Sequence, residues 1–162
     1  MSNRQRLSRD RMAERIVEYY AACNRGDVVA LEALFSPDVV HYFLAPNLAP
    51  RAVAGGAHLA AYWRKVQARF DGCWVVDHVL ADESVQEAVI EWTLFWTPPE
   101  TGRRVATRGA EWYVFSDGLM SEIRAYYRQD PAAPSELEGF PYAERGYAQL
   151  GAEHSTVQPA PR

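Results

Sequence analysis

The sequence has little of several features that define whole classes of protein. Only one of its 162 residues, Lys65, is a lysine, only two are cysteines, and acidic residues outnumber basic ones by 21 to 17. A net charge of −4 gives no electrostatic footprint for nucleic acid, and no run approaches the roughly eighteen apolar residues of a membrane span. Cys23 and Cys73 stand apart, with no partner at metal-ligand spacing. We therefore expect reduced thiols in a cytoplasmic protein, with no disulfide framework and no zinc site.

Short motifs that indicate a cofactor are also missing. The sequence has no glycine-rich nucleotide loop, no HExxH zinc motif and no GxSxG nucleophile motif. Its first fifteen residues are polar and lack the apolar core of a secretory signal. We expect no cofactor and no metal ion, and neither nucleic acid nor a membrane as a partner.

The hydrophobic period of the sequence changes near residue 73. Before that point, apolar side chains recur every three to four residues and predict three helices, over about 9–24, 27–34 and 59–70. Between them, Val39–Phe43 predicts a strand, and 45–56, with its prolines and glycines, predicts a loop. From Cys73 the period is two, which predicts a meander of four strands over 73–80, 85–97, 103–115 and 119–128. This order favours an α+β fold, with three N-terminal helices packed on one face of the sheet.

The composition changes again after Tyr127. We interpret residues 1–130 as one domain and residues 131–162 as a C-terminal extension that contains five prolines. The extension also has several large apolar side chains, too many for a free tail, so we expect it to pack across the domain or onto a partner subunit. The end, from His154, is predicted to be disordered.

Two segments resemble the NTF2-like superfamily. The first is EYYAACNRGD at 18–27, followed by Leu31, Leu34-Phe35 and Asp38; the second, similar to the SnoaL-like branch, is GAEWYVFSDGL at 109–119 with EIRAYY at 122–127. The resemblance covers about residues 10–128 and implies a cone, in which a curved mixed or antiparallel sheet wraps over the helices and encloses a pocket. Because this superfamily includes isomerases, cyclases, epoxide hydrolases, dehydratases and non-catalytic binders, the resemblance implies a pocket rather than one reaction.

The resemblance also maps functional positions onto this sequence. In ketosteroid isomerases of this fold, a first-helix tyrosine and a strand carboxyl form an oxyanion hole, and these positions match Tyr19 and Glu111. The position of the proton-transferring base is occupied by Phe43, and the catalytic aspartate of limonene epoxide hydrolases aligns with Ala125. Neither of those two mechanisms is therefore complete in this chain.

Glu111 is the strongest candidate for chemistry. Its strand row contains Gly109, Tyr113 and Phe115, and a carboxyl buried among such groups can give or take a proton near neutral pH. An ion pair with a nearby arginine would give it a structural role instead. His41 shares a face with Phe43 and could replace the missing base, or it could be a core histidine that makes one hydrogen bond.

Two tyrosines and a second histidine are weaker candidates. Tyr19 would donate its phenol to an oxyanion, although core packing of Tyr19 or Tyr20 is the alternative. His78 shares a face with Trp74 and is a weaker version of His41. The pocket wall is expected to contain four aromatic residues, which favours a small apolar or aromatic ligand: Phe43, Trp63, Tyr113 and Tyr127.

The strand predicted over 85–97 has two rows that compete for the interior. One row is apolar throughout, from Ala88 through Ile90, Trp92 and Leu94 to Trp96, while the resemblance points Glu91, Thr93 and Phe95 into the cavity. The apolar row can be buried while Glu91, Thr93 and Phe95 point into the cavity if the apolar row faces a second copy of the chain. A monomer would rarely expose such a patch. We therefore expect Glu91 in the pocket and a homodimer through the outer face of the sheet.

Together these features favour a cofactor-independent enzyme that applies general acid–base catalysis to a small apolar molecule, as an isomerase, cyclase, dehydratase or hydrolase. Glu111 and His41 would be its acid and base, and Tyr19 its oxyanion donor. A non-catalytic binding or accessory module with a dimer face is the alternative, favoured by the apolar residues at 43 and 125. A transport adaptor has little support, because no partner motif is present beyond the apolar row.

Overall fold

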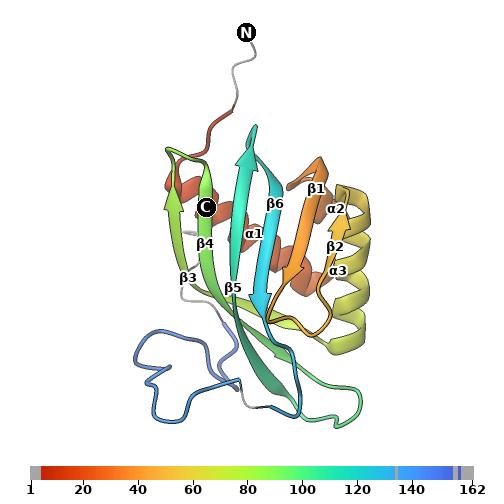
Figure 1. The fold of residues 1–162 in the computed structure, drawn as a ribbon, viewed down its shortest axis with the longest axis vertical. Coiled ribbons are helices and arrows are strands. Elements are labelled where there is room, and N and C mark those ends of the chain that lie inside the picture. The colour runs from red at the N-terminus through yellow and green to blue at the C-terminus, as the bar shows by residue number, and fades with distance from the viewer. Residues whose placement is uncertain (1–4, 134, 155–156, 158–162) are drawn as a thin grey trace.

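The computed structural model describes residues 5–133, 135–154 and 157, and it confirms the α+β class. Three helices lie against one six-stranded sheet; α1 crosses behind the sheet, and α3 stands beside the edge formed by β2 and β1 (Figure 1). Within these residues, no helix is long and apolar enough to cross a membrane. The elements in chain order are α1 (Arg9–Arg25), α2 (Val28–Glu32), β1 (Phe35–Leu44), β2 (Arg51–Ala54), α3 (Gly56–Phe70), β3 (Cys73–Asp82), β4 (Glu87–Trp96), β5 (Val105–Ser116) and β6 (Leu119–Tyr127).

The helix ends follow the capping residues. The side chain of Ser8 accepts a hydrogen bond from the backbone of Arg11, and Gly26 ends α1 with a left-handed φ of 62°. Asp27 caps α2 in the same way, through the backbone of Ala30. One face of α1 is buried, with both Tyr19 and Tyr20 on it. The first helix therefore presents two adjacent phenols to the sheet.

The sheet has the strand order β2-β1-β6-β5-β4-β3 and is mixed, because β1 pairs with β6 in parallel while the other pairs are antiparallel. Residues directly opposite each other on paired strands share a face. Glu111 lies opposite Ala125, which in turn lies opposite Phe43. This register brings His41, two residues before Phe43 on the same face, close to Glu111 from 70 positions away in the sequence.

Two local predictions near β1 are wrong. The predicted loop over 45–56 contains β2, a four-residue edge strand that is too short to show a period of two. The strand predicted over Val39–Phe43 is too short, because β1 begins at Phe35 and includes Pro37, and its pairing with β6 shifts between Phe35 and Val40. A proline is tolerated there because the irregular register interrupts the ladder of hydrogen bonds.

The orientation predicted for β4 is also wrong. Ile90, Trp92, Leu94 and Trp96 are buried in the core of this chain, on the face that carries the helices, and Glu91 points to the opposite face. The ring of Trp92 occupies the space over its cross-strand partner Gly109, where any side chain would collide with it. The apolar row is therefore interior and is not the surface of a dimer.

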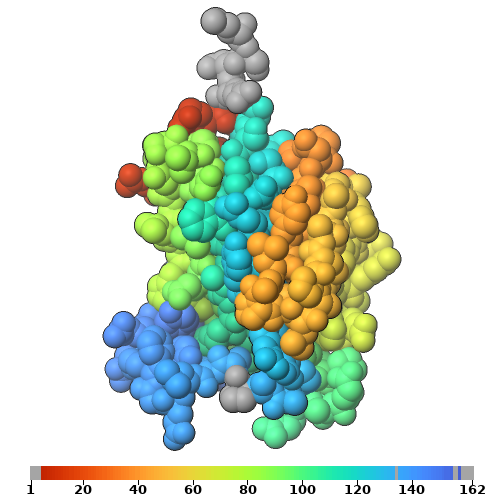
Figure 2. All heavy atoms as spheres, in the orientation of Figure 1, coloured from red at the N-terminus to blue at the C-terminus, as the bar shows by residue number. Residues whose placement is uncertain are grey.

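The described part of the C-terminal extension packs on the outer face of the sheet, beside the lower ends of β3 and β4 (Figures 1 and 2). The backbone N–H of Ala148 donates to Asp77 Oδ1 at 2.8 Å, and Arg108 donates to the carbonyl of Ala148 at 2.8 Å. The extension thus contacts its own domain, one of the two expected arrangements. The disorder predicted from His154 onward falls mostly outside the described residues.

Candidate active site

A pocket of about 370 Å³ lies between α3 and the inner face of the sheet. This volume is at the lower end of the range of about 300–1,000 Å³ that is typical of small-molecule sites. Glu111 is its acidic lining residue, and Arg51, Lys65, Arg69 and Gln129 are the other polar ones. The rest of the wall is apolar or aromatic: Tyr62, Trp63, Val66, Phe70, Trp74, Trp92, Leu94 and Tyr127.

Glu111 is buried, with 3% of its surface exposed, and two phenols hold one of its oxygens. Tyr20 donates to Glu111 Oε2 at 2.5 Å, and Tyr113, from the same strand as Glu111, donates to the same atom. Burial is the main cause, and the negative charge of Glu111 the second, of a pKa well above the usual value for both tyrosines. Both phenols therefore keep their protons and remain hydrogen-bond donors over the physiological range of pH.

His41 lies beside the other carboxylate oxygen. It is fully buried, and its Nε2 is 3.7 Å from Glu111 Oε1, which is longer than a hydrogen bond. Among the described residues, neither ring nitrogen has a hydrogen-bond partner, and the ring stacks on Phe43 with 4.3 Å between centroids. Leaving buried polar atoms unpaired costs stability. A titratable ring is therefore kept next to a buried carboxyl at a structural cost, an arrangement typical of sites with a chemical role.

The pocket wall contains further unpaired donors. The indole N–H groups of Trp63 and Trp92 are buried and have no acceptor in the described part of the chain, although both tryptophans line the pocket. Buried indole N–H groups usually find a partner. A ligand that carries an oxygen acceptor would satisfy donors that the protein leaves unsatisfied.

The structure brings most of the predicted site residues together, with one exchange. Glu111 and His41 are adjacent, and Trp63 and Tyr127 line the pocket, while Phe43 and Tyr113 lie behind that wall in the core. Tyr20, not Tyr19, reaches the carboxylate. Tyr19 is fully buried and contacts the rings of Tyr20 and Tyr113 edge-on, at centroid distances of 4.9 and 6.1 Å.

Glu91 and His78 lie on the other face of the sheet, away from the pocket. Glu91 Oε2 is 2.9 Å from His78 Nδ1 and accepts a hydrogen bond from Tyr147 of the C-terminal extension. His78 Nε2 is 2.9 Å from the carbonyl oxygen of Arg145. Partial burial, together with the bond to Glu91, raises the pKa of Tyr147 to about 12. This cluster attaches the extension to the sheet.

Sequence reasoning missed several residues of the site. Trp74 and Trp92 were not assigned to the pocket, and neither were the cations Arg51, Lys65 and Arg69. One signal was present for Trp92: Gly109 stands in the same strand row as Glu111, and a glycine in a strand often marks room for a neighbouring group. A second signal was the chain's single lysine on an amphipathic helix, next to pocket-lining Val66.

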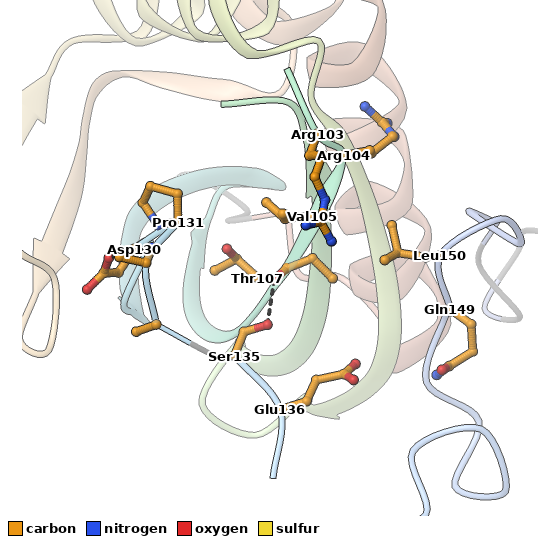
Figure 3. A pocket seen from close by; sticks show the side chains of 13 residues that line it. Arg103, Arg104, Val105, Thr107, Asp130, Pro131, Ser135, Glu136, Gln149 and Leu150 are labelled. Carbon is orange, nitrogen blue, oxygen red and sulfur yellow. Dashed lines mark hydrogen bonds between the residues drawn. The ribbon is translucent and has the colours of Figure 1, made fainter. Parts of the chain in front are cut away.

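A second cavity, of about 490 Å³, lies under the C-terminal extension (Figure 3). Arg103 and Arg104 both line it, and Arg104 is already engaged, donating to both carboxylate oxygens of Glu153 at 2.7 Å. Ser135 donates to the carbonyl of Ala106. Because these groups connect the extension to the sheet, the cavity offers less for chemistry than the pocket with Glu111. Within the described ranges, no three His, Cys, Asp or Glu side chains are grouped as metal ligands.

Comparison with known proteins places this geometry in context. The sequence-family model for the SnoaL-like domain matches residues 16–123 of this chain. The chain is similar to a protein of unknown function with a cystatin-like fold from Methylobium petroleophilum PM1, with 35% identity, a TM-score of 0.67 and 98% of each chain covered. No curated protein matches.

Two further solved structures share the fold at lower identity. One, from Pseudomonas putida KT2440, is provisionally described as a polyketide cyclase; identity is 24%, the TM-score is 0.59, and 71% of this chain and 90% of that chain are covered. The other is an LEH-like epoxide hydrolase from M. tuberculosis, with 19% identity, a TM-score of 0.59, and coverage of 72% and 82%. These two likenesses concern the fold alone.

Proposed function

Because the chain belongs to the SnoaL-like family, we propose that it is a cofactor-independent enzyme in which Glu111 transfers a proton within an apolar pocket. The observation that carries this proposal is the state of Glu111, a buried carboxyl that lines the pocket with one oxygen bonded to two phenols. The cone-shaped interior and the cytoplasmic location expected from the sequence are part of the same proposal.

The two oxygens of Glu111 have different tasks in this proposal. Tyr20 and Tyr113 fix Oε2 and stabilise the negative charge of the carboxylate. Oε1, with no phenol bonded to it, takes a proton from the substrate and returns it to another atom of the same molecule. His41 Nε2 lies 3.7 Å from Oε1 and makes no hydrogen bond to it in this structure, so it would have to move closer to donate to that oxygen during the reaction.

This arrangement fits reactions that need only a proton to be moved in a water-poor site. Isomerisation, cyclisation, dehydration and hydrolysis meet that requirement, and the neighbours described as cyclase and epoxide hydrolase belong to this range. The aromatic wall favours a small apolar or aromatic substrate. An oxygen on that substrate would find the unpaired indole N–H groups of Trp63 and Trp92.

The experiment uses 5-nitrobenzisoxazole, an aromatic probe of bases in apolar pockets. Removal of its C3 proton breaks the N–O bond and releases the yellow 2-cyano-4-nitrophenolate, so the proton passes to the base and no other reactant is needed. Glu111→Gln keeps the shape but removes the base, and it should lower kcat/KM by about 10²-fold or more. Glu100→Gln, at an exposed carboxyl, is the matched control. Equal rates for wild type and Glu111→Gln would remove Glu111 from the mechanism.

Two single variants distinguish the contributions of the two phenols of α1, Tyr19 and Tyr20. Tyr20→Phe removes a donor from the Glu111 carboxylate and should slow the same elimination, whereas Tyr19→Phe, which leaves both donors to Oε2 in place, should change it little. The reverse ranking would return the role of phenol donor to Tyr19, as the sequence predicts. Thermal melting curves of both variants establish that they are folded.

A non-catalytic binding module is the second candidate function, favoured by one observation. Phe43 and Ala125, where related enzymes carry a base or an acid, are fully buried and apolar in this structure. A binder would take up aromatic ligands with no titration near neutral pH and would show no elimination above the background of the Glu111→Gln variant.

A further inference from the structure

The pocket has a strongly positive rim in a protein that is negative overall. Arg51 on β2 and Lys65 and Arg69 on α3 line it, and all three side chains are exposed. The strand and the helix that carry them lie side by side at one edge of the molecule (Figure 1). The net charge of the chain is −4, and Lys65 is its only lysine. The positive charge is therefore local to the pocket.

Carboxylates do not neutralise these three cations. Within the described residues, no ion pair involves Arg51, Lys65 or Arg69. Other arginines, such as Arg104 and Arg108, are paired with glutamates. The rim cations thus remain available to a charge from outside the protein.

Arg51 is held in place by aromatic contacts. Its guanidinium lies 4.4 Å from the centroid of the Phe43 ring and donates to the hydroxyl of Tyr62 at 2.5 Å. Lys65 and Arg69 are four residues apart and so lie on the same side of α3. Two elements therefore present cations to the same opening, one of them oriented in advance.

We propose that the ligand of this pocket is an organic acid, with an apolar or aromatic body inside the pocket and its anionic group at Arg51, Lys65 and Arg69. This inference rests on the proposed function and names its substrate class. The charge distribution also orients the ligand. The carboxylate of Glu111 disfavours an anion in the interior, while the rim attracts it. The acidic group then stays at the opening, and the uncharged end of the ligand meets Glu111.

Two isosteric compounds test the charge requirement, 2-naphthoate and 2-naphthamide, which differ in the anionic group. Isothermal titration calorimetry of the full chain at low ionic strength should show naphthoate binding about tenfold more tightly, as expected for a few partly exposed ion pairs. Adding salt should reduce that preference, because salt screens exposed charges. In the triple variant Arg51→Gln, Lys65→Gln, Arg69→Gln the preference should disappear, so that naphthoate and naphthamide bind with equal affinity.

Arg64→Gln provides the matched control, since Arg64 is an exposed cation on α3 that lies against Gly26 rather than at the pocket. This variant should keep the tenfold preference. Equal affinities for the two compounds in the wild type, or no binding of either, overturn the inference, and so does a preference that survives in the triple variant. The elimination of the uncharged 5-nitrobenzisoxazole is a separate readout, so the proposed role of Glu111 can stand when the acid preference fails.

Discussion

Replacing His41 by leucine should make the protein more stable and less active. The ring is fully buried, and its two nitrogens have no hydrogen-bond partner among the described residues. Each unpaired buried polar atom costs about 1–3 kcal/mol. Removing both therefore returns at least about 2 kcal/mol to the folded state.

Two losses oppose this gain. The stack of His41 on Phe43 disappears, at a cost of about 0.5–1.5 kcal/mol. Leucine is of similar size, so repacking against Trp63 is a small additional cost. With the lower figure for the gain and about 1 kcal/mol, the middle of the range, for the lost stack, the net stabilisation is about 1 kcal/mol. This corresponds to a rise in Tm of about 2–4 °C for a chain of this length.

Thermal unfolding followed by circular dichroism measures this shift, and His78→Leu is the control. The two nitrogens of His78 are 2.9 Å from Glu91 Oε2 and from the carbonyl oxygen of Arg145, so its replacement removes contacts and should not raise Tm. The sign of the change thus differs between two histidines of one sheet. A fall in Tm of His41→Leu comparable to that of a core truncation would refute the reasoning, because it would mean that both ring nitrogens are satisfied.

Two further predictions concern the whole molecule. Burial raises the pKa of Tyr19, Tyr20 and Tyr113 well above the usual value of about 10. Their protonated phenols therefore stabilise the folded state below that pH, and this contribution is lost as the pH rises further. An ultraviolet titration should show these phenolates only on unfolding, and their appearance in the folded protein would contradict this prediction. We also expect a homodimer through the outer face of the sheet, where Trp112 and Tyr126 are 39% and 41% exposed and where β5 and β6 are visible beside the extension (Figure 2). Sedimentation velocity should give a mass of twice 18.3 kDa for the wild type and a monomer for the double variant Trp112→Glu, Tyr126→Glu, and a monomeric wild type would contradict this expectation.

The helices and the strands of the meander could be predicted because their signals are local. Ser8, Asp27 and Gly26 end or begin helices through their own capping chemistry, which does not depend on distant residues. β2 could not be predicted in this way. It is stabilised by pairing with β1, and its four residues between a proline and a glycine show no period of their own.

The candidate site was predicted in part. The sequence of its strand indicates that the Glu111 carboxyl is buried, but it does not indicate which side chains of other elements contact that carboxyl. Tyr19 and Tyr20 both belong to the buried face of α1, and the helical period cannot decide which of two adjacent phenols meets Glu111. That choice depends on how α1 crosses the sheet. The proximity of His41 depends on the parallel pairing of β1 with β6, which no local pattern indicates.

The error on β4 has a specific physical cause. Both of its faces are covered, one by the helices and the other by the C-terminal extension, so Thr93 and Phe95 are as buried as Trp92. A strand that is buried on both sides shows no alternation of apolar and polar residues. An alignment that is shifted by one residue then exchanges the two faces of the strand. The glycine opposite Trp92 identifies the inner face, because the ring needs the space that a side chain at Gly109 would fill.

The pocket on this inner face contains polar and charged groups that a ligand could satisfy. Unpaired polar atoms gather around it, on His41 next to Glu111 and on the indoles of Trp63 and Trp92, while the cations of the rim lack carboxylate partners in the described residues. A chain selected for stability alone would pair or remove these groups. A ligand with an oxygen acceptor and an anionic group would satisfy the indole donors and neutralise the rim. Because such a ligand binds the folded state and not the unfolded chain, its affinity adds directly to the stability of the protein.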